Sequence, residues 1–148
     1  MITPIRPILL AEDNANDVEL TLAALRGHVA NPIVVARDGT EALDFLYRRG
    51  AHASRGNEPP AVILLDLKMP KVDGLEVLRT VKGDEGLRTI PVVVLTSSAE
   101  ESDLVRSYEL GVNAYVVKPV AFTEFMHAVK LLGQFWAAIN QRPVASGA

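Results

Sequence analysis

No cysteine occurs in the 148 residues of this chain. Its absence excludes disulfide bonds, thiolate metal sites and cysteine nucleophiles. An excess of charge of one sign is also missing, because 15 Lys and Arg residues stand against 18 Asp and Glu residues, and the basic residues form no continuous stripe. A large nucleic-acid interface or a surface for anionic membranes is therefore not expected, and we predict neither nucleic acid nor membrane as a partner.

Long apolar stretches are absent as well. The N-terminal residues MITPIRPILLA are too short in their apolar part for a signal peptide, and no segment is long enough to span a membrane. These absences favour a cytoplasmic protein. The length suits one domain, which we place at residues 1–140, followed by a flexible C-terminal tail at residues 141–148.

Short apolar runs alternate along the chain with stretches whose apolar residues recur at helical spacing. The runs show little alternation of apolar and polar residues, which is typical of parallel strands covered on both faces. A helical pattern follows each run, the last from about Phe122 to Ile139. We predict an α/β fold, a doubly wound parallel sheet of five strands with five helices, and an exposed loop at residues 50–60. The runs lie at residues 8–11, 33–36, 61–65, 92–95 and 114–117.

The residues that end the predicted strands are mostly polar. In an open parallel sheet, ligands bind outside the carboxyl ends of the strands. We therefore expect three carboxylates, a group of hydroxyls and one amine to meet at one edge of the sheet. These groups are Glu12-Asp13, Asp66, Thr96-Ser97-Ser98 and Lys118.

Each of these groups also has an ordinary structural explanation. An acidic pair such as Glu12-Asp13 often lies at the start of a helix, where the helix dipole favours it. Thr96 is of a type that often caps a helix, and Lys118 is of a type that often leaves a strand into solvent. Asp66 is harder to explain in this way, because it follows a run predicted to form a buried central strand, where an unpaired carboxylate is costly.

Together, the groups indicate phosphoryl chemistry at a metal. Three neighbouring carboxylates raise one another's pKa unless a cation neutralises them, and Mg²⁺ prefers oxygen ligands. A hydroxyl at Thr96 and an ammonium at Lys118 suit the oxygens of a phosphoryl group, and Asp66 can act as the nucleophile. The residues thus predict a metal held by Glu12, Asp13 and Asp66 beside a phosphoryl site.

Four motifs, LLAEDN, DLKMPKVDG, LTSSA and AYVVKP, occur in order on this pattern. Over roughly residues 6–139 the chain resembles the receiver domain of two-component response regulators, and the resemblance implies the strand order 2-1-3-4-5. The loop at residues 50–60 and the AEDNANDVEL start make it most similar to the single-domain regulators paired with bacterial or cyanobacterial phytochromes. Glu12 departs from the family pattern, in which many members carry Asp, but keeps the charge.

The resemblance implies a role for each residue of the site. Asp66 corresponds to the phosphoacceptor, and Mg²⁺, with Mn²⁺ or Ca²⁺ as substitutes, corresponds to the cofactor. The implied metal ligands are Glu12, Asp13, Asp66 and the backbone carbonyl of Lys68, with Glu12 acting through water. The implied phosphoryl-binding residues are Thr96, Ser97 and Lys118.

The resemblance also implies a switch and a set of loop-shaping residues. Thr96 and Tyr115 correspond to the residues that respond to phosphorylation. Pro70, Gly74 and Pro119 correspond to residues that shape the loops. Gly74 would do so through φ angles closed to other residues, and Pro119 through a cis peptide bond before it.

These correspondences predict a signalling protein, with self-catalysed phosphotransfer and dephosphorylation as its only chemistry. A sensor histidine kinase, more narrowly a phytochrome, would transfer a phosphoryl group to Asp66, and the surface of the fourth helix, fifth strand and fifth helix would change. Two alternatives are a receiver-like binding module that is not phosphorylated and, more distantly, a metal-dependent phosphatase. Apolar residues on two sides of the last helix allow either a thick core stripe or a homodimer surface.

Overall fold

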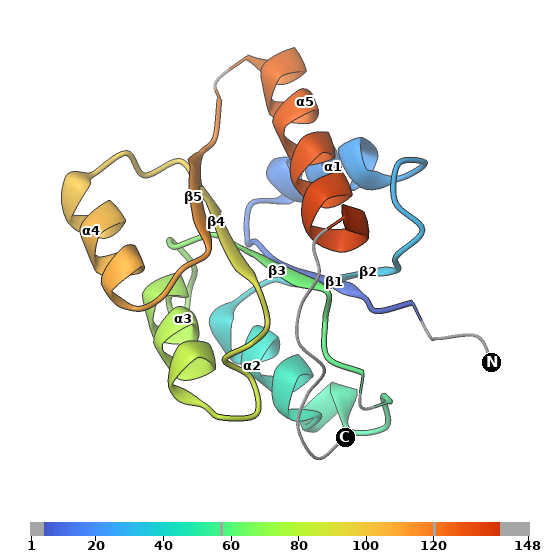
Figure 1. The fold of residues 1–148 in the computed structure, drawn as a ribbon, viewed down its shortest axis with the longest axis vertical. Coiled ribbons are helices and arrows are strands. Elements are labelled where there is room, and N and C mark those ends of the chain that lie inside the picture. Colours follow the sequence, from blue (N-terminus) through green and yellow to red (C-terminus); the bar gives the residue numbers. More distant parts are fainter. Residues whose placement is uncertain (1–4, 57, 120, 140–148) are drawn as a thin grey trace.

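The five apolar runs form one parallel sheet, as predicted (Figure 1). The computed structural model describes residues 5–56, 58–119 and 121–139. The strand order is β2-β1-β3-β4-β5, so the order reverses between β1 and β3, where a ligand site is expected. The strands are β1 (Ile8–Ala11), β2 (Ile33–Ala36), β3 (Val62–Leu65), β4 (Val92–Thr96) and β5 (Ala114–Val117).

Helices cover both faces of the sheet. Their bounds are α1 (Ala15–Leu25), α2 (Gly39–Tyr47), α3 (Gly74–Gly83), α4 (Glu101–Glu109) and α5 (Phe122–Gly133). α1 and α5 lie on one face, and α2, α3 and α4 lie on the other (Figure 1). Side-chain caps begin three of the helices, because Asn14, Asp38 and Asp73 each accept a hydrogen bond from a backbone N–H of the first turn.

The core has two layers because successive residues of a strand point to opposite faces of the sheet. In β1, Ile8 and Leu10 pack on the side of α1 and α5, whereas Leu9 and Ala11 pack on the side of α2 and α3. β1 and β3 are buried along their whole length, which explains why their sequences lack the alternation of a half-exposed strand. This burial determines the strand register and therefore which residue ends each strand.

Two segments add detail that the sequence pattern did not predict. The mostly exposed loop at residues 50–60 contains a short 3-10 helix, Gly50–His52. Its Arg55 guanidinium donates a hydrogen bond to the carbonyl oxygen of Phe45 at 2.7 Å and lies 4.0 Å from the centre of that ring. The last helix ends at Gly133 and continues as a π-helical segment, Gln134–Ile139. The predicted tail at residues 141–148 lies outside the described residues.

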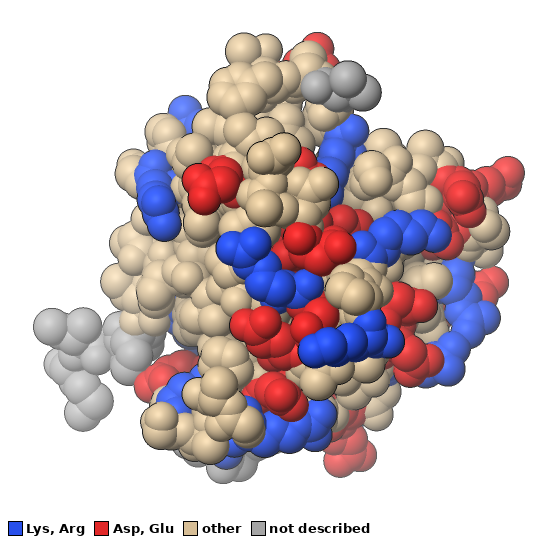
Figure 2. Space-filling model, turned by 180° about the vertical axis from the view of Figure 1, so that it is seen from behind, with Lys and Arg blue, Asp and Glu red and all other residues tan. Residues whose placement is uncertain are grey.

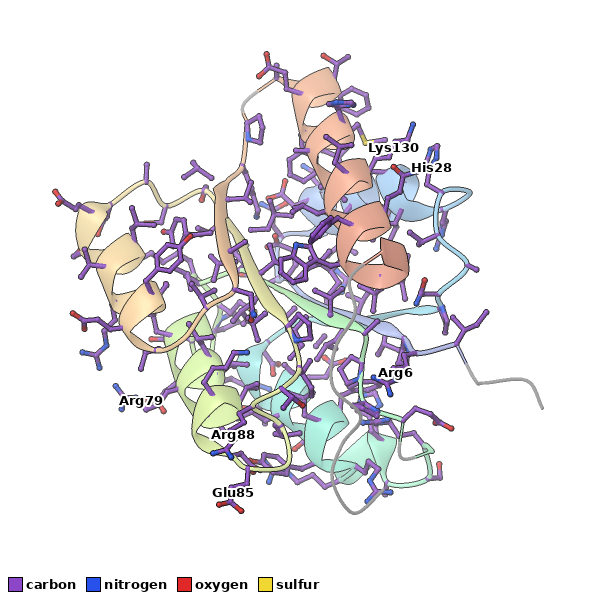
Figure 3. The ribbon with its side chains drawn as sticks, in the orientation of Figure 1. Arg6, His28, Arg79, Glu85, Arg88 and Lys130 are labelled. Atoms are coloured by element: carbon purple, nitrogen blue, oxygen red, sulfur yellow. The ribbon has the colours of Figure 1, made fainter. Side chains whose placement is uncertain are left out.

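Acidic and basic side chains intermingle over the face shown in Figure 2, in agreement with the mixed charge of the sequence. Charged side chains such as those of Arg79, Glu85 and Arg88 point away from the body of the molecule (Figure 3). None of the helices in the described part of the chain combines the length and the apolar character that a membrane span requires.

Candidate functional site

The strand ends meet at the carboxyl edge of the sheet because backbone hydrogen bonding continues one residue beyond the strands. The N–H of Glu12 donates to the last carbonyl oxygen of β2 at 2.9 Å, and the N–H of Asp66 donates to that of β1 at 3.0 Å. The N–H of Lys118 donates to the last carbonyl oxygen of β4 at 2.7 Å. Three groups that are distant in sequence are thereby positioned by the sheet itself.

Lys118 lies at the centre of the site. Its Nζ donates hydrogen bonds to a carboxylate oxygen of Glu12, to Asp17 Oδ2 at 2.7 Å and to Asp66 Oδ2 at 3.1 Å. The side chain of Lys118 is only 7% exposed, and those of Glu12 and Asp66 are 3% and 7% exposed. An ammonium has three N–H donors, so each donor has a carboxylate partner. Lys118 thereby compensates part of the negative charge buried here.

Burial and mutual contact shift the pKa values of these groups. Burial, and after it a hydrogen bond with Asp66, raise the pKa of Glu12 to about 7. For Asp66, burial favours the neutral form, but the hydrogen bond with Glu12 and the charge of Lys118 outweigh it, and the pKa is lowered. For Lys118, burial opposes the charge, but hydrogen bonds with Asp17 and Glu12 outweigh it, and the pKa is raised. Asp66 is therefore the carboxylate that stays ionised, whereas Glu12 is only partly ionised near neutral pH.

The carboxylates fit a divalent metal. Glu12, Asp13 and Asp66 each offer an oxygen, and these oxygens lie within 4.8 Å of one another. Asp13 is exposed and lines a hollow of about 430 Å³ together with Lys68, so the cluster opens to solvent on this side. The N–H of Lys68 donates to Asp66 Oδ1 at 3.3 Å, which places its backbone beside the cluster. An all-oxygen set of this kind suits hard cations, and the Lys68 carbonyl stays a predicted ligand.

The predicted hydroxyl groups divide between two places. Thr96 is fully buried, and its hydroxyl helps to keep the pKa of Asp66 low. The same hydroxyl oxygen accepts a hydrogen bond from the N–H of Ser98 at 3.2 Å. Ser97 is exposed and lines a hollow of about 290 Å³ together with Lys118. The structure thus brings Thr96 to the carboxylate of Asp66 and places Ser97 at an opening beside Lys118.

The predicted switch residue Tyr115 is connected to the same loop. Its hydroxyl donates a hydrogen bond to the carbonyl oxygen of Ser98 at 2.9 Å, and its ring packs against the core on the α2 and α3 side. The Ser98 hydroxyl donates to Asp103 Oδ2 at 2.6 Å, and Lys68 Nζ lies 3.6 Å from the same oxygen. Polar contacts therefore lead from the site both to β5 and to the first turn of α4.

Gly74 shapes the loop after Asp66 for a different reason from the predicted one. It is not among the described glycines with positive φ; the left-handed conformation falls instead on Lys71, just after Pro70, with φ of 65°. A Cβ at Gly74 would lie 2.2 Å from the carbonyl oxygen of Asp66 and 2.6 Å from the Cα of Leu67. The close approach of α3 to the end of β3, and not an unusual φ angle, therefore requires this glycine.

The cis peptide bond predicted before Pro119 is wrong, because every peptide bond of the described residues is trans. The trans form of an X–Pro bond is favoured by about 0.5–1 kcal/mol unless the surroundings reverse the preference. Lys118 forms its backbone and side-chain hydrogen bonds with a trans bond after it. Pro119 itself lines the hollow that contains Ser97 and Lys118.

Two residues of the site were not predicted from the sequence. Asp17 pairs with Lys118, and Asp103 holds Ser98 and Lys68. Both lie in the first turn of a helix, where an acidic residue is ordinary because the helix dipole favours it. The one sequence feature that could have indicated Asp17 is its position in the first turn of the helix that follows the acidic pair.

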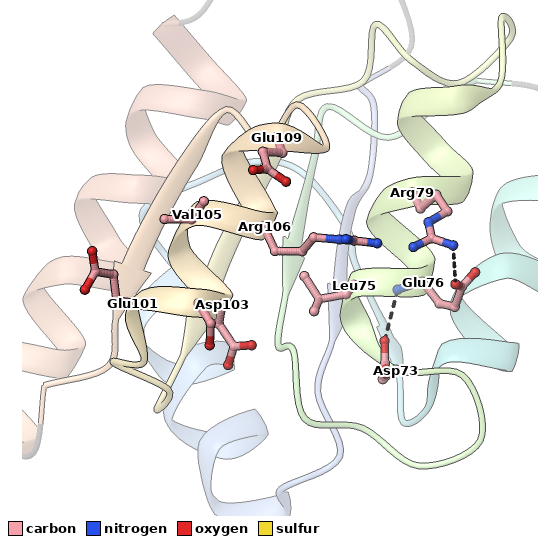
Figure 4. Close-up of a pocket in the computed structure, with 10 residues that line it drawn as sticks. Asp73, Leu75, Glu76, Arg79, Glu101, Asp103, Val105, Arg106 and Glu109 are labelled. Atoms are coloured by element: carbon pink, nitrogen blue, oxygen red, sulfur yellow. Dashed lines mark hydrogen bonds and ion pairs between the residues drawn. The ribbon is translucent and has the colours of Figure 1, made fainter.

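A larger hollow, of about 800 Å³, lies between α3 and α4 (Figure 4). It shares Asp73 and Asp103 with the hollow beside Asp13. Its walls carry charged side chains of both signs, including Glu76 and Arg79, which pair at 3.2 Å. Asp73 is occupied as the cap of α3, and we assign no ligand to this hollow.

Residues 8–130 match the model of the response regulator receiver domain. The chain belongs to this family. The response regulator Rcp1 of Synechocystis sp. is 39% identical over 144 residues, which are 96% of this chain and 96% of the relative. Residues 8–130 span all five strands and reach into α5, so the family match covers the whole site.

Solved structures of receivers support the same assignment. The bacteriophytochrome response regulator AtBRR is 64% identical and matches 94% of this chain and 100% of its own, with a TM-score of 0.75. The phosphorylated cyanobacterial phytochrome response regulator RcpA is 39% identical and matches 95% of this chain and 100% of its own, with a TM-score of 0.88. The Mn²⁺-bound form of Rcp1 is 37% identical and matches 94% of this chain and 99% of its own, with a TM-score of 0.86. The receiver is therefore similar to response regulators of phytochromes.

As a response regulator, the chain is a signalling protein of a two-component system. The comparisons give no support to the alternatives of an unphosphorylated binding module or a phosphatase. Binding of a divalent metal agrees with the Mn²⁺-bound relative and with the acidic cluster of this receiver.

The affinity of this receiver for a divalent cation should depend on pH, because the acidic cluster attracts a cation more strongly when Glu12 is ionised. With its pKa at about 7, the affinity for Mg²⁺ should rise about tenfold from pH 6 to pH 8 and then level off. Isothermal titration calorimetry in two buffers would measure the proton released. Glu12→Gln should bind more weakly and lose this dependence; an unchanged dependence in that variant would contradict the assignment.

Gly74→Ala should destabilise the receiver by about 2–3 kcal/mol, because the added Cβ meets rigid backbone. Gly83→Ala is the matched control, since it lies in the same helix and its added Cβ has nothing within 4 Å. The control should be neutral or stabilise by up to about 1 kcal/mol. Urea unfolding measures both variants, and equal effects would show that the close approach is not the constraint.

Proposed function

We propose that Asp66 accepts a phosphoryl group from the phosphohistidine of a sensor histidine kinase. The observation that carries the proposal is the contact between a buried, ionised Asp66 and the ammonium of Lys118, at 3.1 Å, within a cluster that suits a cation. Glu12 is a less effective nucleophile near neutral pH because its raised pKa leaves part of it protonated. The contact explains how a carboxylate stays reactive at the end of a buried strand.

The transfer requires one bond to form and one to break. A carboxylate oxygen of Asp66 attacks phosphorus, the P–N bond to the kinase histidine breaks, and its electron pair stays on the imidazole, which takes up a proton. Lys118 turns N–H donors to the phosphoryl oxygens, with the hydroxyls of Thr96 and Ser97 as further donors. A bound divalent cation would neutralise the charge on those oxygens. In a separate step, dephosphorylation, water attacks phosphorus and gives up a proton, the P–O bond to Asp66 breaks, and the carboxylate is regenerated as inorganic phosphate leaves. We infer no other catalytic activity.

We propose Mg²⁺ as the cation, with Mn²⁺ or Ca²⁺ as substitutes. Glu12 through water, Asp13, Asp66 and the carbonyl of Lys68 would hold it. Oxygen ligands beside a phosphoryl group are the surroundings in which Mg²⁺ commonly occurs. The Mn²⁺-bound form of the relative Rcp1 supports a divalent cation of this kind.

Phosphorylation would change the surface of α4, β5 and α5, and contacts that the receiver already makes lead from the site to α4 and β5. The Thr96 hydroxyl oxygen now accepts a hydrogen bond from the N–H of Ser98. A phosphoryl oxygen would draw this hydroxyl away from Ser98. Ser98 is also hydrogen-bonded to Tyr115 of β5 and to Asp103 of α4, so a shift of Ser98 would alter the contacts of both elements. Phosphorylation would thereby favour one of two packings of the loop before α4.

The kinase that we propose is a phytochrome, and the place of the reaction is the cytoplasm. The likeness to AtBRR and RcpA, both named as phytochrome response regulators, supports this partner. We further propose that residues 1–140 form the receiver domain; the family match over residues 8–130 supports this.

Asp66→Asn should abolish phosphorylation, because an amide cannot serve as the nucleophile. Mass spectrometry would measure hydroxylamine-sensitive labelling by acetyl phosphate and by an autophosphorylated bacteriophytochrome kinase. Asp44→Asn, which changes a carboxylate paired with Arg49 at the end of α2, is the matched control and should be labelled fully. Full labelling of the Asp66 variant would reject the acceptor, and labelling of the wild type by acetyl phosphate alone would reject the phytochrome partner.

We also propose a homodimer formed through α4, β5 and α5. The exposure of the last helix supports this proposal, because Phe125 and Val129 are buried in the core whereas Leu131 and Phe135 are about half exposed. α4 and β5 also carry exposed apolar side chains, and exposed apolar patches often mark interfaces. The exposed apolar side chains are Leu104, Val105, Tyr108, Val117, Phe122, Leu131 and Phe135.

Leu131→Glu should weaken the homodimer at least about tenfold, because it places a charge in an apolar interface. Sedimentation equilibrium with and without Mg²⁺ and fluoroberyllate, a phosphoryl mimic, would measure the dissociation constant. Ile5→Glu, at an apolar residue of similar exposure outside this surface, is the control and should dimerise like the wild type. A wild-type receiver that is strictly monomeric at high concentration in both states would defeat the proposal.

A further inference from the structure

A carboxylate outside the predicted site holds the central lysine. Asp17 Oδ2 accepts a hydrogen bond from Lys118 Nζ at 2.7 Å, a shorter distance than the 3.1 Å to Asp66. Asp17 is not one of the three residues of the acidic cluster that suits a cation. With Lys118 it lines the hollow of about 290 Å³ between α1 and α5, whereas other residues line the hollow beside Asp13. It therefore reaches the ammonium from a different side.

The first turn of α1 determines the position of Asp17. Asn14 caps this turn, and its Oδ1 accepts a hydrogen bond from the N–H of Asp17 at 3.0 Å. The N–H of Asn14 in turn donates to Glu12 Oε2 at 3.2 Å. Val18, the next residue, is buried in the core and anchors the helix. Asp17 is thus held by a capped and packed helical turn, while its side chain stays 28% exposed and keeps contact with water.

We propose that Asp17 is a positioning residue for phosphoryl transfer, because it holds one N–H of Lys118 while the other two turn to the phosphoryl group. The inference rests on the proposed function of Asp66. A cation at the acidic cluster would engage oxygens of Glu12 and Asp66, and the phosphoryl group is itself attached to Asp66. Among the three carboxylates that accept hydrogen bonds from Lys118, Asp17 is the one that neither binds the cation nor carries the phosphoryl group. Its hydrogen bond with Lys118 can therefore persist before and after phosphorylation.

Asp17 has two opposite effects on the bound phosphoryl group, and their sizes differ. It competes with the phosphoryl oxygens for the N–H donors of Lys118, and it also orients the ammonium. An ammonium has three donors, so two stay available when Asp17 takes one, and competition costs little. Without Asp17, the flexible four-carbon chain of Lys118 is free to turn into the adjoining hollow. Orientation is therefore the larger effect.

The test compares the affinity for fluoroberyllate at saturating Mg²⁺, measured by calorimetry. Asp17→Asn should bind about three- to tenfold more weakly, a range between that of an exposed ion pair and that of a buried charge-assisted hydrogen bond. Asp17→Glu, which restores the charge, should recover most of the loss. Glu19→Gln, which removes an exposed carboxylate from the same helix, should stay within about twofold of the wild type. Binding of Asp17→Asn at wild-type affinity or tighter would overturn the proposal.

A double-mutant cycle with Lys118→Met separates positioning from a structural role. If Asp17 acts through Lys118, Asp17→Asn should cause no further loss in the Lys118→Met background; an equal loss there would overturn the proposal. If Lys118→Met does not fold, the Asp17→Glu variant decides, and failure to recover affinity overturns the proposal. The two proposals can be rejected separately. Full labelling of Asp66→Asn would reject the proposed function, whereas normal fluoroberyllate binding by Asp17→Asn would reject only the positioning role of Asp17.

Discussion

The hydrogen bonds of Lys118 to three carboxylates are the interaction on which the site depends. Glu12 and Asp66 are almost fully buried, and an ionised carboxylate taken out of water costs of order several kcal/mol unless it is paired. Lys118 offsets part of this cost, and the raised pKa of Glu12 reduces it further, because that group is only partly ionised near neutral pH. Negative charge therefore remains at the site, and a cation can neutralise it.

The sheet makes this arrangement possible because it holds the backbone of each participant. Glu12, Asp66 and Lys118 each continue the backbone hydrogen bonding of a neighbouring strand, so their positions follow from the register of a fully buried core. The close approach of Gly74 to the end of β3 adds a further limit on the loop. Side chains at this edge of the sheet can thus change their contacts while the backbone of the strands keeps its position.

A path of direct contacts connects that chemistry to a distant surface. The Thr96 hydroxyl lowers the pKa of Asp66 and accepts a hydrogen bond from Ser98, and Ser98 is hydrogen-bonded to both Tyr115 and Asp103. The path is short because β4 and β5 are neighbours in the sheet and α4 begins directly after the hydroxyl cluster. A change at the acceptor is therefore able to reach α4 and β5 without any rearrangement of the core.

The sequence by itself determined the five strands, the helices between them and the residues that end each strand, because buried parallel strands are uninterrupted apolar runs. It also determined that Glu12, Asp13, Asp66, Thr96 and Lys118 share one edge. Only the tertiary structure decided which carboxylates Lys118 contacts, that Asp17 is among them, that Gly74 is required by close approach and that the bond before Pro119 is trans. These features depend on distances between segments far apart in the chain, which local patterns of residue type do not contain.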